Sequence, residues 1–135
     1  MPLNPALWIA WTFTCKLKEP KMNIESFNED INYNEDRIVT KVIIESSFSK
    51  EIRILLKERQ IMKEHKAPFP IIVHLLEGEL EFGVEGELIV LKKGDILSLE
   101  GNIPHDLTAL KDSIVRLTLS KLDDVRRVNE VAENT

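Results

Sequence analysis

Few side chains in this 135-residue sequence are suited to binding a metal ion or transferring a proton. The single cysteine, Cys15, excludes both an intramolecular disulfide and a zinc site built from several cysteines. The chain also shows no glycine-rich phosphate-binding loop and no Gly-x-Ser-x-Gly nucleophile elbow. The clearest remaining candidates are the three histidines, His65, His74 and His105, because imidazole transfers protons near neutral pH and binds transition metals.

The composition excludes several classes of partner. With 18 basic and 23 acidic residues the net charge is −5, and no basic block is present. We therefore expect no nucleic-acid partner and no binding to an anionic membrane surface. No apolar run approaches 18 residues, so no transmembrane span is predicted. The length and the 43% hydrophobic content are typical of one globular domain with an ordinary core.

Residues 1–21 differ in composition from the rest of the chain. They contain both tryptophans and the cysteine, and residues 6–15 form an uncharged, mostly apolar run. A signal peptide is disfavoured because no Lys or Arg precedes this run and no clear cleavage site follows it. We therefore expect residues 1–21 to be a weakly ordered N-terminal extension, residues 22–135 to be a single domain, and the protein to be cytoplasmic.

From residue 37 onward the spacing of apolar residues indicates short β-strands. We expect strands over residues 37–45, 51–57, 61–65, 70–77, 79–84, 87–91, 96–99 and 113–120. Alternation along them predicts five inward side chains, Leu80, Phe82, Val115, Leu117 and Leu119. The almost wholly apolar stretch 70–77 predicts a central strand buried on both faces. With one helix expected over Asp123–Ala132, the pattern predicts an all-β antiparallel sandwich or barrel.

Two segments of this β region resemble conserved motifs of a known superfamily. Residues 62–78 (MKEHKAPFPIIVHLLEG) resemble the first cupin motif, and residues 94–105 (GDILSLEGNIPH) resemble the second. The fifteen residues between them are similar to the compact spacing of small bacterial cupins. The resemblance, over about residues 38–119, implies a double-stranded β-helix, the cupin jelly-roll barrel. Residues 22–135 would then be one cupin domain that ends in the short helix.

The same resemblance implies where a metal ion would bind. In the cupin family, which this chain resembles, the metal site consists of three histidines and one glutamate. His65 and His105 are retained at two of these positions, whereas Ala67 replaces a histidine and Ile71 replaces the glutamate. A stable site for Fe, Mn, Ni or Zn normally needs three or four protein ligands, and neither replacement has a donor atom. We therefore expect His65 and His105 to hold at most a weakly bound divalent ion.

A third ligand would have to come from another residue nearby. Strand alternation places His74 on the opposite face from Ile71, where the glutamate would point. Glu64 and Asp106 each adjoin a retained histidine in sequence and so also point away. Met62 is a further candidate, and its thioether is a soft ligand suited to copper.

Three functions remain open on these residues. The first is a module that binds a small molecule in an apolar barrel, with His65 and His105 at its mouth. The second is a metal-dependent enzyme, dioxygenase- or isomerase-like, with an incomplete set of ligands for Zn, Ni, Fe, Mn or Cu. The third is metal-free acid–base catalysis, as the superfamily's sugar epimerases imply, which needs a carboxylate to orient the histidine; none is visible at matching positions. The ligand count favours the binding module.

Two expectations about geometry and assembly complete the prediction. We predict that the rings of His65 and His105 face one barrel cavity, within reach of one ion or one polar group of a ligand. The resemblance to small cupins also implies a homodimer, and unpaired edge strands make such pairing physically reasonable.

Overall fold

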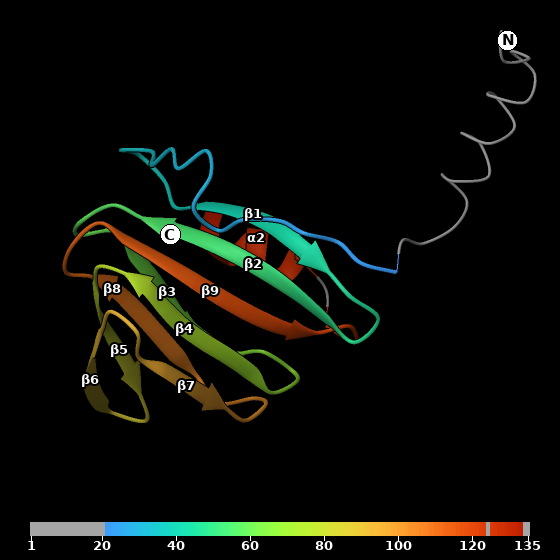
Figure 1. Cartoon of the computed structure of the whole chain (residues 1–135). Helices are drawn as coiled ribbons and strands as arrows, with labels where there is room; N and C mark the ends of the chain where they lie inside the picture. Colours follow the sequence, from blue (N-terminus) through green and yellow to red (C-terminus); the bar gives the residue numbers. More distant parts are fainter. Residues whose placement is uncertain (1–20, 124, 134–135) are drawn as a thin grey trace, which may run out of the picture.

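The computed structural model describes residues 21–123 and 125–133 (Figure 1). Within these residues the chain forms nine strands and one helix. The elements are β1 (Val39–Glu45), β2 (Ser49–Leu56), β3 (Ile61–His65), β4 (Ile71–Glu77), β5 (Glu79–Val84), β6 (Glu87–Lys92), β7 (Ile96–Leu99), β8 (His105–Ala109), β9 (Ser113–Ser120) and α2 (Val125–Glu133). The predicted extension, residues 1–21, lies outside the described residues except for Lys21.

The strands form two antiparallel sheets that face each other as a jelly-roll barrel (Figure 1). The five-stranded sheet has the order β1-β2-β9-β4-β7, and the four-stranded sheet has the order β3-β8-β5-β6. The predicted all-β barrel with a short C-terminal helix is therefore confirmed. The five side chains expected to point inward, Leu80, Phe82, Val115, Leu117 and Leu119, are all buried.

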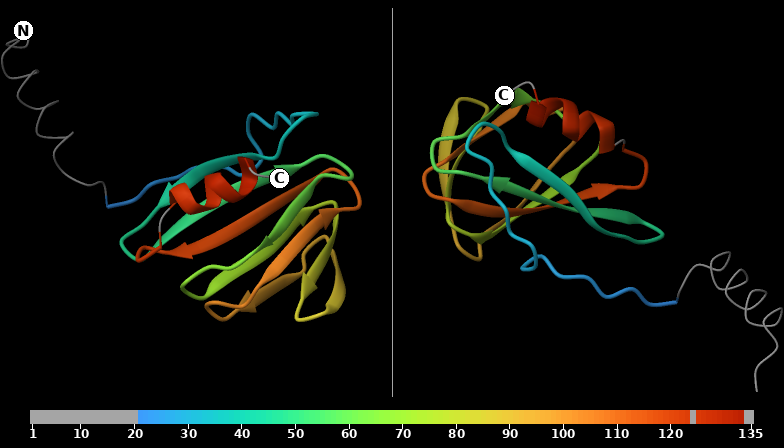
Figure 2. Two further views of the ribbon diagram at one scale, coloured as in Figure 1. Left: turned by 180° about the vertical axis from the view of Figure 1, so that it is seen from behind. Right: turned by 90° about the horizontal axis from the view of Figure 1, so that it is seen from above.

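Helix α2 lies against one side of the barrel, in contact with β3 and β1 (Figure 2). Its residues Val128 and Ala132 are buried in the core that the two sheets share. The Thr40 hydroxyl of β1 donates a hydrogen bond to the side-chain oxygen of Asn129, at 2.8 Å. The helix is therefore part of the barrel wall. The sequence predicts this helix from Asp123, but Asp123 lies in a turn, where its backbone N–H donates a hydrogen bond to the Ser120 carbonyl oxygen.

Two expectations about individual strands were wrong. Strand β8 was not predicted, although it pairs with both β3 and β5. Strand β4 was expected to be buried on both faces, but Ile72 on its outer face is 37% exposed. In the part of the chain that the structure describes, no helix covers this outer face, so β4 is buried on its inner face alone.

Glycines shape the two turns at the ends of β5. Glu85 and Gly86 both have positive φ, 49° and 79°, which gives the two-residue hairpin that joins β5 to β6 the twist its strands require. Gly78, between β4 and β5, has φ 95°. A Cβ atom on Gly78 would lie 2.3 Å from the Ser113 Oγ and 2.4 Å from the Asp112 carbonyl oxygen. Only glycine fits this crossing.

A polar cluster joins β2 to β9 on the face away from the core. Glu51 accepts hydrogen bonds from the Arg116 Nε and the Ser49 hydroxyl, each at 2.8 Å, and from the Thr118 hydroxyl at 2.5 Å. Burial raises the pKa of Glu51, but these hydrogen bonds outweigh it and leave the pKa below its usual value. The carboxylate is therefore held in its ionised form.

The buried Arg53 of β2 holds the N-terminal segment against the same outer face. Its guanidinium donates hydrogen bonds to the carbonyl oxygens of Phe27, Glu29 and Asp30, at 3.2, 2.7 and 3.3 Å. These carbonyls come from a segment without regular secondary structure, so the arginine supplies hydrogen bonds that a sheet or helix would otherwise supply.

None of the described helices is long and apolar enough to cross a membrane.

Candidate functional site

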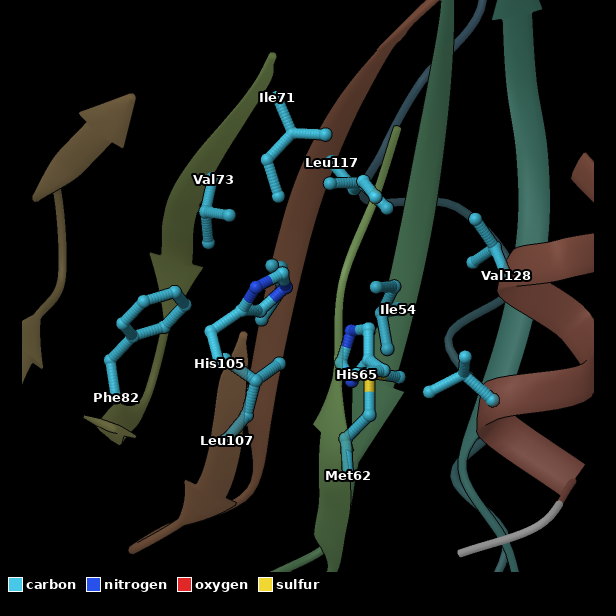
Figure 3. A pocket seen from close by; sticks show the side chains of 13 residues that line it. Ile54, Met62, His65, Ile71, Val73, Phe82, His105, Leu107, Leu117 and Val128 are labelled. Carbon is cyan, nitrogen blue, oxygen red and sulfur yellow. The ribbon is translucent and has the colours of Figure 1, made fainter. Parts of the chain in front are cut away.

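The structure brings His65 and His105 together inside the barrel (Figure 3). Their Cα atoms are direct partners across β3 and β8. The two ring centroids lie 4.3 Å apart, with an angle of 61° between the ring planes. Both rings line one cavity, as the sequence predicts, although 40 residues separate them in the chain.

A β-bulge in β3 turns His65 into the barrel. Met62 pairs with Leu107 and His65 pairs with His105, so β3 has one residue more than β8 between these two pairs. A bulge of this kind shifts the alternation of side chains by one position. Met62 and His65 therefore share the inner face despite their odd spacing in sequence.

A backbone carbonyl oxygen lies beside the Nδ1 atom of each ring. The Nδ1 atom of His65 lies 2.6 Å from the Lys63 carbonyl oxygen, and the Nδ1 atom of His105 lies 2.9 Å from that of Ile103. A carbonyl oxygen only accepts hydrogen bonds, so Nδ1 is the protonated nitrogen in each ring. In the neutral form, Nε2 then carries the lone pair that can bind a metal or accept a proton. Sequence reasoning looked for an orienting carboxylate and missed these carbonyls, which have no residue-type signal.

The cavity around the two rings is small and mainly apolar. Its volume is about 30 Å³, enough for about two water molecules, since one needs roughly 10–15 Å³. His105 is only 4% exposed and stacks on Phe82, with the ring centroids 5.5 Å apart. The lining residues are Ile54, Met62, His65, Ala67, Ile71, Val73, Phe82, His105, Leu107, Val115, Leu117, Val128 and Val131.

The other candidate ligands lie where the sequence predicts. Ala67 and Ile71, at the positions of the missing ligands, are buried and present only carbon to the cavity. His74 points to the opposite face of β4, where its buried Nδ1 has no hydrogen-bond partner among the described residues. Glu64 is exposed, and the Asp106 carboxylate lies over the backbone of Gly83, outside the cavity. None of these three reaches the histidine pair.

The described residues do not provide the ligand set of a full cupin metal site. Among them, no group of three or more His, Cys, Asp or Glu side chains is placed to hold one ion. Two neutral imidazoles leave a divalent transition metal short of its usual three or four protein ligands. The cupin metal centre therefore does not fit this cavity.

The two sheets, the jelly-roll order and the histidine pair inside the barrel define a protein of the cupin class. A family model described as a cupin domain matches residues 53–121, which is half of the chain, so this protein belongs to the cupin family. No protein of curated function matches the chain.

Solved structures resemble this chain over 56–73% of its length. An RmlC-like cupin from Desulfovibrio desulfuricans is 25% identical, with a TM-score of 0.65 over 73% of this chain and 96% of that one. A protein from Thermus thermophilus is 19% identical, with a TM-score of 0.66 over 73% and 98% of the two chains. A salicylate 1,2-dioxygenase from Pseudaminobacter salicylatoxidans is 17% identical, with a TM-score of 0.53 over 56% and 21%. The last two likenesses show the fold alone.

Proposed function

We propose that this cupin is a cytoplasmic module that binds a small, mainly apolar molecule in its barrel. The observation that carries the proposal is the apolar cavity that presents two oriented imidazoles. Binding pockets commonly combine apolar walls with a few fixed polar groups that orient the ligand. Because Nε2 of each neutral ring accepts hydrogen bonds, the matching ligand carries a hydroxyl or another donor.

The size of the cavity sets a condition on binding. An engineered protein cavity that accommodates benzene measures roughly 150 Å³, several times the volume here. A ligand of more than a few heavy atoms therefore needs the wall to move. Helix α2 is the wall that we expect to move, because its residues Val128 and Val131 line the cavity.

A pair of simple probes tests this proposal. Phenol and toluene have similar shapes, but only phenol donates a hydrogen bond. We expect phenol to raise the melting temperature more than toluene, with roughly fivefold tighter binding, because one hydrogen bond contributes about 1 kcal/mol. Replacing His105 by alanine should abolish the preference for phenol.

A cavity-filling variant is the matched control. Ala67→Leu adds three carbon atoms inside the cavity and leaves both histidines in place. We expect this variant to lose the stabilisation by either probe. If neither probe stabilises the unmodified protein, the barrel is not the binding site. The same conclusion follows if the probes stabilise Ala67→Leu as much as they stabilise the unmodified protein.

We also propose that two copies of the chain pair through the edge strand β6. This strand is paired only with β5, on one side, within the described part of the sheet. Its residues Leu88, Ile89 and Val90 are exposed, although each is a large apolar side chain. An apolar edge of this kind favours pairing with another strand. Sedimentation should show a dimer that Val90→Lys converts to monomer, and a monomeric unmodified protein would contradict this assignment.

A further inference from the structure

Helix α2 covers the side of the barrel on which the two sheets are not joined. Strand β1 is an edge of the five-stranded sheet and β3 is an edge of the four-stranded sheet, and within the described chain no strand bridges them. The helix contacts both edge strands (Figure 2). On this side the barrel wall is therefore a helix that packs through its side chains, in place of a ladder of backbone hydrogen bonds.

The same helix forms one wall of the apolar cavity. Val128 and Val131 line the cavity, and every other lining residue except Ala67 belongs to a strand. Figure 3 shows Val128 projecting from α2 toward the side of the cavity where Ile54 and His65 lie. Among the described residues, none from β1 lines the cavity. Movement of α2 away from the barrel would therefore open the cavity to solvent through the gap between β1 and β3.

We propose that α2 is a lid over this gap. It lifts to admit a ligand between β1 and β3 and then packs against the bound molecule. This inference rests on the proposed function, because a lid is needed only if the barrel takes up a molecule larger than its cavity of about 30 Å³. It adds the route of entry and the element that controls exchange with solvent.

The attachment of α2 is weaker than that of any central strand. Among its described side chains, Val128 and Ala132 belong to the buried core and Val131 packs against it. The Thr40 hydroxyl adds a hydrogen bond to Asn129. A central strand such as β9, in contrast, pairs along its length with both β2 and β4. Elements with few buried apolar contacts open locally at a lower free energy than global unfolding requires, so α2 should open while the barrel stays folded.

Labelling of a buried thiol in the native state tests whether α2 opens. Val128→Cys places a thiol on the inner side of the helix, in a Cys15→Ser background that removes the natural thiol. Val115→Cys is the matched control, because Val115 lines the same cavity from the central strand β9 and is 1% exposed. Ellman's reagent is too large for a cavity of about 30 Å³, so it reaches the control thiol only when the barrel unfolds.

Without urea, we expect Val128→Cys to react at least tenfold faster than Val115→Cys. Its rate should change little at low urea concentrations, because lifting one helix exposes little surface. The rate of the control should rise steeply with urea, because global unfolding exposes the whole core. Equal rates with the same urea dependence in the two variants would overturn the lid.

A reversible crosslink tests whether this opening admits the ligand. Thr40→Cys and Asn129→Cys, with Cys15→Ser, replace side chains whose oxygens lie 2.8 Å apart, so a short, reducible bis-methanethiosulfonate reagent can join α2 to β1. Ser46→Cys and Ser49→Cys are the matched control pair. Their hydroxyls lie 3.3 Å apart at the turn between β1 and β2, and neither lines the cavity. Mass spectrometry confirms each crosslink before phenol is added.

We expect the crosslink between positions 40 and 129 to abolish the rise in melting temperature that phenol causes, and reduction of the crosslink to restore it. The control crosslink should leave the effect of phenol unchanged. An equal effect of phenol with and without the 40–129 crosslink would overturn the lid, as would an equal loss of the effect in the control pair. If phenol stabilises no form of the protein, the binding proposal fails, and the thiol rates alone decide whether α2 opens.

Discussion

The substitution Gly78→Ala gives a stringent test of the barrel's packing. At φ 95° the residue lies in the left-handed region that disfavours every residue with a Cβ atom. The new Cβ would also lie 2.3 Å from the Ser113 Oγ, 2.4 Å from the Asp112 carbonyl oxygen and 2.7 Å from the Ser113 Cα. Ordinary carbon contacts are about 3.5–4.0 Å. The strand turn must therefore open by about 1 Å, the difference between these distances.

The neighbouring residue cannot yield without further loss. Ser113 is fully buried, and its hydroxyl bonds to the backbone of both Lys111 and Glu79. The left-handed φ costs roughly 1–2 kcal/mol and the overpacking roughly 1–3 kcal/mol more. We therefore expect Gly78→Ala to lower the free energy of unfolding by about 2–5 kcal/mol. At roughly 4 °C per kcal/mol for a domain of this size, the melting temperature falls by about 8–20 °C.

Gly86→Ala separates the two contributions. Gly86 also has positive φ, 79°, but a Cβ atom at this position would have no other atom within 4 Å. This variant should lose only the conformational contribution of roughly 1–2 kcal/mol. Urea unfolding of the unmodified protein and both variants measures the difference directly. If Gly78→Ala is no less stable than Gly86→Ala, the close approach of Gly78 to Ser113 is wrong.

Three further predictions concern acid stability, the N-terminus and divalent ions. The pKa of Glu51 is lower in the folded than in the unfolded chain, so its stabilisation is complete above the unfolded value of about 4.3 and is lost as the pH falls through the folded value. Urea midpoints in Glu51→Gln should therefore depend less on pH in that range, and an unchanged pH dependence would contradict this. A protein that begins at Met22 should melt within a few degrees of the full chain, whereas a larger fall would show that residues 1–21 stabilise the fold. Calorimetry should detect weak Zn²⁺ or Ni²⁺ binding that declines below about pH 6, where imidazole becomes protonated. This binding should disappear in His65→Ala and in His105→Ala. Equal binding in all three proteins would exclude the two histidines as ligands.

The strands that the sequence predicted correctly are those with a clear alternation. Phe82 and Leu117 are examples, because the pleat of a half-buried strand fixes which side chains point inward. Strand β8 escaped prediction because His, Asp and Thr interrupt its apolar pattern; its place depends on pairing with β3 and β5. The outer face of β4 was misjudged because a continuous apolar run resembles a strand covered on both sides.

The candidate site was predictable only in part. The absence of donor atoms at Ala67 and Ile71 is a property of residue type, so it is visible in the sequence. The bulge in β3 is not visible, because it arises where two strands distant in sequence pair with unequal lengths. Simple alternation would have placed Met62 and His65 on opposite faces. The sequence therefore names Met62 as a candidate ligand but does not show that it shares the inner face with His65.

Each imidazole lies beside a carbonyl oxygen of its own strand segment. Ring and carbonyl both lie within residues 63–65 for His65, and within residues 103–105 for His105. Each of these two tripeptides therefore contains both a ring and the carbonyl beside its Nδ1 atom, and the one-residue bulge sets their pairing.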